Sequence, residues 1–320
     1  MKIIDMHVDT LLKMISGKMN GEDISLLDNN INVDLNRLRS SNYIGQVFAC
    51  YVDLGVLPFT DSHYGDALEM INILKGEIEN NKNLISLTSD LKTHLENQEK
   101  DLISGFLSVE EGGIIGEDLE KLDELYELGV RFITLTWNYE NAIGFPNFEG
   151  KYQYEGLKPF GREVLEKMDD LGIVVDVSHL SDGGFYDIAK YGKRPFLATH
   201  SNSRKVQNHL RNLTDEMIKA LANKGGLMGL NFCDLFLDGD KSSVESMIRH
   251  FKHIVNVGGE DVIGLGTDFD GISEENLELK GVEDTPKLID ALEREGIKPR
   301  VIEKFAYKNF EDFLYRFENY

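Results

Sequence analysis

Short runs of apolar, largely β-branched residues recur along the chain, and stretches with helical spacing separate them. Residues 118–128 show this spacing, because apolar side chains return every three to four positions. Gly129 follows this stretch and Gly172 follows 162–171, and each predicts a helix end. Thr214 is predicted to cap a helix that runs to Ala222. The eight runs predicted as strands are 3–9, 46–54, 102–110, 131–137, 173–179, 195–200, 226–233 and 262–268.

This alternation predicts a parallel sheet covered by helices, since strands buried on both faces are continuously apolar. Eight such strands favour a closed (β/α)8 TIM barrel of the metal-dependent hydrolase type, and a doubly wound open sheet is the competing α/β architecture. We expect residues 1–320 to form one barrel domain, with a helical extension over 286–320 on the outside of the barrel. The long connections 55–71 and 139–159 are candidate lids over the active face.

Histidines and carboxylates stand at the ends of five of these apolar runs. They are His7 and Asp9 in the first run, Glu110 in the third, His179 in the fifth, His200 in the sixth and Asp268 in the eighth. The carboxyl ends of barrel strands meet at one face, where active sites lie, so we expect these side chains to share a site. Burying so many charges costs several kcal/mol each without compensation, and a bound cation is the simplest compensation.

The donor types and their spacing point to a two-metal site. His7 and Asp9 are two residues apart, so in a strand they share a face. Three histidines and two carboxylates without cysteine suit borderline ions such as zinc. Five ligands exceed one open tetrahedral site and fit two ions that share a carboxylate, with Glu110 the natural bridge. Two ions about 3.5–4 Å apart can hold a hydroxide between them and polarise a carbonyl.

Seven short motifs, in order, resemble the membrane (renal) dipeptidases, a metallopeptidase family of the amidohydrolase superfamily, over nearly the whole chain. They are DMHVDT at 5–10, SVEEGG at 108–113, LGVRFITLTW at 128–137, DVSHLS at 176–181, ATHSNS at 198–203, HLRN at 209–212 and IGLGTDFDGI at 263–272. The resemblance implies hydrolysis of the amide bond of a dipeptide by a hydroxide that bridges two zinc ions. It also implies that D-configured second residues are accepted and that a homodimer is common.

The resemblance implies a role for each site residue. His7 and Asp9 would bind one zinc ion, Glu110 would bridge, and His179 and His200 would bind the second ion. Asp268 would carry a proton from the bridging water to the leaving amine. Arg211 would hold the C-terminal carboxylate of the substrate.

Three positions leave a choice. Related enzymes carry a histidine after the fourth strand, thought to stabilise the oxyanion, where this chain has Trp137 followed by Asn138. Either could donate a hydrogen bond there, and Trp137 could instead be a pocket wall. The spacing from Glu110 to the helix end favours Glu110 over Glu111 as the ligand, which leaves Glu111 as a supporting or solvated carboxylate. Asp270 competes with Asp268 as the catalytic acid.

Five histidines complete the set. We expect His63, His94, His250 and His253 at the solvent-exposed surface, and His209 near the pocket because it precedes Arg211 by two residues.

The composition limits which binding partners and which cellular compartment are expected. The net charge of −22 argues against binding to nucleic acid or to an anionic membrane surface. The N-terminal run is interrupted by charged residues, so no signal peptide is expected, and no stretch is long enough to span a bilayer. Cys50 and Cys233 stand in apolar runs without a CxxC spacing, which indicates buried thiols and a cytoplasmic location.

Two other functions compete with the dipeptidase. One is an amidohydrolase acting on another small amide or a lactone. Such enzymes often have HxH in the first strand and a carboxylated lysine, whereas this chain has HxD and no lysine at a predicted strand end. The other is an inactive metal-binding protein on the same scaffold, against which the complete ligand set and Asp268 argue. The donor set leaves zinc, cobalt and manganese open as the native ion.

Overall fold

Eight parallel strands close into a barrel in the computed structural model, which describes residues 1–320. The hydrogen-bonded order is β1, β2, β4, β5, β6, β7, β8 and β9, and β9 pairs back with β1. The (β/α)8 prediction is therefore confirmed, and the open sheet is excluded. The strands are β1 (Ile3–Val8), β2 (Tyr43–Tyr51), β3 (Ile85–Leu87), β4 (Ile103–Glu110), β5 (Val130–Thr134), β6 (Val174–Asp176), β7 (Leu197–Ala198), β8 (Leu227–Leu230) and β9 (Ile263–Leu265).

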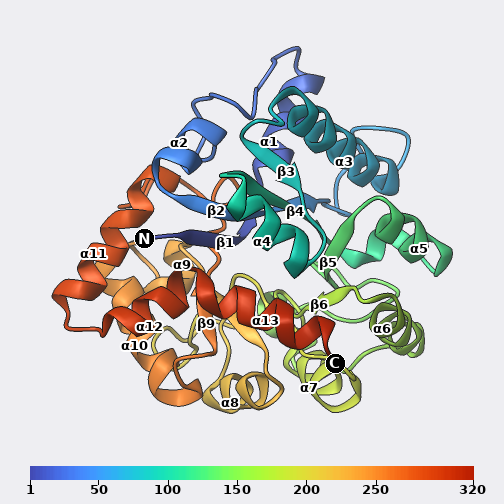
Figure 1. Ribbon diagram of the computed structural model, residues 1–320. Helices are drawn as coiled ribbons and strands as arrows, with labels where there is room; N and C mark the ends of the chain where they lie inside the picture. The colour runs from blue at the N-terminus through green and yellow to red at the C-terminus, as the bar shows by residue number, and fades with distance from the viewer.

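Helices surround the barrel (Figure 1). They are α1 (Thr10–Met19), α2 (Leu35–Ser40), α3 (His63–Asn80), α4 (Leu91–Glu99), α5 (Glu120–Glu127), α6 (Pro159–Leu171), α7 (Asp182–Tyr191), α8 (Asp215–Asn223), α9 (Asp234–Leu237), α10 (Val244–Gly258), α11 (Thr285–Arg294), α12 (Pro299–Glu303) and α13 (Asn309–Glu318). The predicted helix ends agree with the structure: Gly172 ends α6 in a left-handed conformation, with φ of 78°. The Thr214 side chain caps α8 by accepting from the Met217 N–H.

Several strands end earlier than the apolar runs predict. β6 ends at Asp176, β7 at Ala198 and β9 at Leu265, so the polar residues predicted at these strand ends lie just beyond them. His179 and Asp268 have φ of 67° and 65°. This left-handed backbone is rare for residues with a Cβ and is incompatible with strand pairing. Such conformations cluster at functional sites because the surrounding structure must impose them.

Two segments differ from the sequence-based expectation. β3 was not predicted, since three residues carry no recognisable period. It pairs with the first half of β4 only, before β5 takes up the pairing. The second half of the 55–71 connection is helical, because α3 begins at His63 and is capped by the Ser62 side chain.

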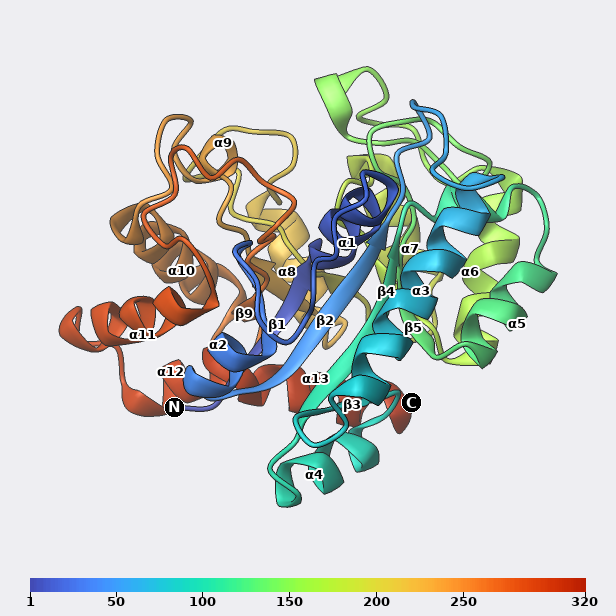
Figure 2. The same ribbon diagram turned by 90° about the horizontal axis from the view of Figure 1, so that it is seen from above.

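The C-terminal helix α13 closes one end of the barrel, and this corrects the expectation that the whole extension packs outside. Figure 1 shows α13 across the barrel, and Figure 2 shows it at the end where both termini lie. Its apolar side chains pack against inward-facing residues of the strands and fill the barrel floor. This cluster contains Ile4, Met6, Val47, Phe106, Phe132, Val174, Leu197, Leu227, Phe310, Phe313, Leu314 and Phe317. A filled floor leaves the opposite, carboxyl-terminal face as the place for a site.

Candidate metal centre

Glu110 stands at the centre of the side chains predicted to share a site. It ends β4 with an almost completely buried carboxylate. One oxygen, Oε2, lies 3.1 Å from His7 Nε2. The other, Oε1, lies 3.1 Å from His179 Nε2 and 3.5 Å from His200 Nε2. The two oxygens thus face different histidines, which is the arrangement that a bridging carboxylate requires.

The tautomer of His200 follows from its neighbours. The Thr199 hydroxyl lies 2.5 Å from Asp176 Oδ2 and 2.8 Å from His200 Nδ1. A hydroxyl has one proton, and the carboxylate needs it, so the Thr199 oxygen must accept from His200 Nδ1–H. Nε2 of His200 therefore carries a lone pair. A metal-ligating histidine is commonly oriented in this way through its other nitrogen.

His179 has the same tautomer as His200, with the proton on Nδ1 and the lone pair on Nε2. Its Nδ1 faces Asn138 Oδ1 at 3.4 Å, and its Nε2 lies 3.1 Å from His200 Nε2. Burial lowers the pKa of His179 to about 4 and of His200 to about 3, so both rings are neutral at pH 7. Two nitrogen lone pairs and a Glu110 oxygen therefore converge without a proton between them. Such a group repels itself unless a cation lies at its centre, so these donors fit a metal ion.

A second group of donors lies on the other side of Glu110. His7 Nε2 is 3.6 Å from Asp9 Oδ2 and 3.9 Å from Asp268 Oδ1, and ligand atoms of all three lie within 4.8 Å of one another. Burial opposes protonation of His7, but Glu110 and Asp9 outweigh it and raise its pKa well above the usual value. Asp9 Oδ1 is buried without a hydrogen-bond partner. A cation bound beside Asp9 would therefore be stabilised in this second group as well.

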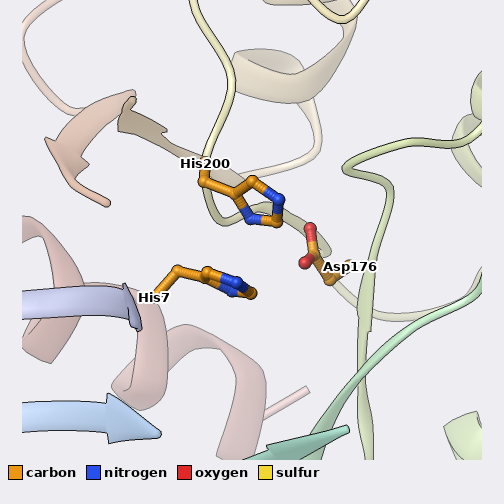
Figure 3. Close-up of side chains that lie close together, drawn as sticks. All are labelled: His7, Asp176 and His200. Carbon is orange, nitrogen blue, oxygen red and sulfur yellow. The ribbon is translucent and has the colours of Figure 1, made fainter. Parts of the chain in front are cut away.

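Asp176 lies close enough to His7 and His200 to form a third donor group (Figure 3). Its carboxylate is already occupied, because it accepts from the Thr134 and Thr199 hydroxyls and from the Ser178 and Thr199 backbone N–H groups. We therefore assign Asp176 a supporting position that orients His200 through Thr199.

Asp268 and Asp270 have different surroundings. Asp268 lines the pocket, and burial together with the Asp9 and Glu110 charges raises its pKa well above the usual value, against the opposing effect of His7. Asp270 accepts from the Thr10 hydroxyl at 2.6 Å and from the Asn32 N–H at 2.8 Å. Asp270 does not line the cavity, and its carboxylate joins the start of α1 to the loop that contains Asn32. The geometry therefore favours Asp268 over Asp270 as the group that meets a substrate.

Glu111 is buried, so the solvated alternative for this residue is wrong. It has φ of 95°, and its carboxylate accepts from the Gly113 N–H, the Trp137 N–H and the Asn141 amide. Burial raises the pKa of Glu111 to about 7. Glu111 ties the segment after β4 to the segment after β5, and so holds the backbone that carries Trp137 and Asn138.

A cavity of about 450 Å³ opens above these donors, and a volume of this size accepts a small ligand. Of the two predicted lids, 139–159 contributes Phe148 to its wall, and 55–71 contributes no lining residue. The lining residues are Asp9, Leu12, Tyr51, Glu110, Trp137, Asn138, Phe148, His179, His209, Arg211, Cys233, Asp234, Leu235, Phe236, Asp268, Gly271, Ile272 and Ser273.

Arg211 is the one arginine or lysine that lines this cavity. It is 5% exposed, and its guanidinium forms no ion pair, although the Asp268, Glu110 and Asp176 carboxylates act on it at longer range. Nη2 donates to the His200 carbonyl at 3.1 Å and Nη1 to Ser201 Oγ at 3.4 Å, while Nε has no partner. A buried cation without a counter-ion is costly, and a ligand carboxylate would supply the missing charge.

The two candidates for the oxyanion position differ in what they can offer. Asn138 Oδ1 faces His179 Nδ1 at 3.4 Å, and the Asn138 Nδ2 donor has no partner within the protein. Trp137 lines the cavity, and its ring packs edge-on against Tyr51 with 5.0 Å between centroids. Its indole N–H makes no hydrogen bond within the protein.

The structure corrects the expected exposure of two histidines. His94 is fully buried, and its Nδ1 lies 2.9 Å from Ser104 Oγ. His250 is also fully buried and accepts from the Ser203 N–H at 3.1 Å while its Nε2 donates to the Leu237 carbonyl at 2.8 Å. His63 and His253 are partly exposed, and His209 lines the cavity as expected.

Acid is expected to destabilise the fold through His250. Burial lowers the pKa of His250 to about 4, and its bond from the Ser203 N–H requires an unprotonated Nδ1. The unfolded chain takes up this proton near pH 6.5. The contribution of neutral His250 to the free energy of unfolding is therefore complete above that pH, and about 2–3 kcal/mol of it is lost as the pH drops towards 4. Thermal unfolding between pH 7 and 4 should show a smaller loss for His250→Gln than for wild type. Equal slopes for His250→Gln and wild type would contradict this assignment.

The fold and this donor set define a metal-dependent hydrolase on a TIM barrel. The sequence profile of the membrane dipeptidase family (peptidase family M19) matches residues 1–318. The chain belongs to this family and is a metallo-dipeptidase by class.

Known relatives agree with this membership. A solved structure of the metallopeptidase dipeptidase AC is 28% identical, with a TM-score of 0.90, covering 99% of this chain and 98% of that one. A metallopeptidase from Rhodobacter sphaeroides, solved with a phosphinate mimic of the dipeptide L-Ala-D-Ala, is 27% identical, with a TM-score of 0.90 and 99% coverage of both chains. An uncharacterized dipeptidase of Schizosaccharomyces pombe is 29% identical over 274 residues, which span 81% of this chain and 65% of that protein.

None of the helices combines the length and the apolar character needed to cross a membrane.

Proposed function

We propose that this protein hydrolyses dipeptides with two zinc ions, held by His7, Asp9 and Glu110 on one side and by Glu110, His179 and His200 on the other. The observation that carries the proposal is the convergence of unprotonated acceptors on Glu110 beside a buried arginine that has no counter-ion. Nitrogen and oxygen donors without sulfur suit zinc. When bound, the ions would polarise the scissile carbonyl and make a water more acidic.

The protein side chains would supply binding and proton transfer. Arg211 would hold the substrate carboxylate and thereby place the neighbouring amide above Glu110. Water adds to the carbonyl carbon, and Asp268 takes a proton from it. Asp268 then returns that proton to the amide nitrogen as the C–N bond breaks, which leaves Asp268 ionised for the next cycle. A panel of dipeptides, tripeptides, lactones and simple amides, assayed with protein of measured metal content, tests this function.

Arg211→Ala is expected to weaken dipeptide hydrolysis selectively. Loss of a charge-assisted hydrogen bond of about 1.5–3 kcal/mol should lower kcat/KM by about 10-fold to 150-fold. A dipeptide whose C-terminus is an amide should be slow with wild type and almost unaffected by the substitution. Steady-state kinetics on both substrates measures this difference.

Arg211→Lys is the matched control because it keeps the charge and loses the planar fork of donors. It should retain part of the discrimination. If Arg211→Ala slowed the acid and the amide substrates equally, the carboxylate grip would be excluded, and an amidohydrolase for neutral amides would be favoured.

Trp137→Phe tests the free indole N–H. We propose that this group donates to the developing oxyanion, because Trp137 lines the cavity and its indole N–H has no hydrogen-bond partner within the protein. Phe keeps the aromatic wall and removes the donor, so kcat should fall about 10-fold to 100-fold while KM changes little. A pocket wall alone predicts an unchanged kcat for Trp137→Phe and a raised KM for Trp137→Ala.

We also propose that residues 1–320 act as one catalytic domain, in the cytoplasm, and that two copies form a dimer. The two free, buried cysteines fit a reducing compartment. Light scattering of the purified protein tests the dimer. An inactive metal-binding homologue remains the alternative if fully metal-loaded protein turns over no dipeptide.

A further inference from the structure

Asn231 follows β8 and is completely buried beside the candidate centre, although it does not line the cavity. Its Oδ1 accepts from the Cys233 N–H at 2.6 Å. Its Nδ2 donates to Asp268 Oδ2 at 2.9 Å and to the His200 carbonyl at 3.2 Å. Asn231 is therefore in contact with the proposed proton carrier without being in reach of a substrate.

The orientation of the Asn231 amide is determined by these partners. The Cys233 backbone N–H can only donate, so it needs the amide oxygen. The His200 carbonyl can only accept, so it needs an amide hydrogen, and the same Nδ2 group then faces Asp268 Oδ2. The reversed amide would lose the bonds to the Cys233 N–H and to the His200 carbonyl, which makes this assignment independent of how the two ends of the amide are drawn.

The backbone of Asn231 is held as firmly as its side chain. Its N–H donates to Asn202 Oδ1 at 3.0 Å, and its carbonyl accepts from Asn202 Nδ2 at 2.9 Å. A buried amide with both its backbone and its side chain bonded has little freedom to move. A side chain that is hydrogen-bonded to Asn231 is therefore held in a fixed position.

Asp268 needs such a support. It lies in the loop after β9 with a left-handed backbone, and Asn231 is the only side chain that donates a hydrogen bond to its carboxyl group. Because Oδ2 is held by Asn231, Oδ1 is the oxygen that faces His7, at 3.9 Å from Nε2. Without this bond the carboxyl could rotate about its χ angles and present either oxygen to the reacting atoms.

We propose that Asn231 is a positioning residue that aims Asp268 Oδ1 at the site of proton transfer. The inference rests on the proposed function, in which Asp268 carries the proton. The His200 carbonyl also accepts from Arg211 Nη2, so Asn231 and the carboxylate grip are anchored at one acceptor. Asn231 thus sets the distance between the end of the substrate that is held and the group that protonates its nitrogen.

The kinetic test uses Asn231→Ala, which removes the amide, and Asn231→Asp, which keeps its shape and replaces the donor with an oxygen. Both variants should lower kcat for L-Ala-D-Ala by about 10-fold to 100-fold, as expected for a misplaced catalytic group, and change KM by less than about 3-fold. Metal content should equal that of wild type. A raised KM with an unchanged kcat would overturn the inference.

A comparison of two substrates separates positioning from general damage. L-alanyl-D-lactate replaces the scissile amide with an ester, whose leaving oxygen depends less on protonation than an amine nitrogen does. If Asn231 acts through Asp268, its variants and Asp268→Asn should all slow the amide more than the ester. A merely structural loss would slow both substrates equally.

Asn309→Ala is the matched control. Asn309 is also a buried amide that donates to two carbonyls, those of Glu260 and Ile263, but it lies in α13 at the closed end of the barrel. The Asn309→Ala substitution should lower the free energy of unfolding without changing the amide-to-ester ratio of kcat. If Asp268→Asn lowers this ratio and the Asn231 variants do not, the inference fails while the proposed function stands. If Asp268→Asn leaves the ratio unchanged, the proton-transfer role of Asp268 fails, and the inference fails with it.

Discussion

Asp268→Asn should lower kcat for dipeptide hydrolysis by about 10³-fold, the contribution typical of a positioned acid–base group. The amide has nearly the shape of the carboxyl group and can still meet Asn231, but it cannot take up and return a proton. KM should change little, because Arg211 still holds the substrate carboxylate. Steady-state kinetics on wild type and variant, with equal metal content, measures this effect.

Asp270→Asn is the control for this prediction. Asp270 lies two residues away and is also buried, but its carboxylate is bonded to Thr10 and Asn32. Its substitution should reduce stability and leave kcat within a few-fold of wild type. If Asp270→Asn were the slower enzyme and Asp268→Asn cleaved dipeptides normally, the assignment of the acid would be reversed.

Removal of metal should abolish activity and lower the melting temperature. Without a cation the lone pairs of His179 and His200 face each other and Glu110, so the metal-free centre is self-repelling. A ligand present at about 1,000 times its Kd stabilises the folded state by about 4 kcal/mol, which the metal-free protein would lose. Chelation, dialysis and thermal unfolding with elemental analysis measure both effects.

Re-addition of zinc should restore activity, and magnesium should not, because magnesium prefers oxygen ligands and retains its waters. The number of ions is tested by single variants. His179→Ala and Asp9→Ala should each retain one ion, whereas Glu110→Ala should lose both. Full activity in metal-free protein would contradict the mechanism.

Much of the fold could be predicted because the pattern that encodes it is local. A strand buried on both faces must be apolar along its length, so all eight barrel strands were visible as runs. The polar residues at their ends were visible for the same reason, since a charge that interrupts an apolar run stands out. His7, Asp9, Glu110, His179 and His200 were selected in this way, and the structure brings them together around Glu110.

The strand ends themselves were less predictable. The left-handed backbone at His179 and Asp268 depends on the loops that hold them, and nothing in their own side chains requires it. β3 escaped prediction because pairing with the first half of β4, and not its own composition, makes it a strand.

Tertiary structure alone decided which polar groups are already occupied. Glu111 and Asp270 look like catalytic carboxylates in the sequence, yet each is bonded to segments that are distant along the chain. His94 and His250 look like surface residues on polar helices, but neighbouring elements cover them. Burial and hydrogen-bond partners are properties of pairs of elements, and a local pattern carries no record of them.

The sequence by itself determined the barrel, the candidate metal donors at its open end and the family to which the chain belongs. The tertiary structure decided the tautomer of His200 through Thr199, the lack of an ion-pair partner for Arg211, and the hydrogen bond from Asn231 to Asp268. These follow from distances of a few ångströms between residues that are separated in the sequence, 23 positions for Asp176 and Thr199 and 37 for Asn231 and Asp268, and only the folded chain establishes such distances.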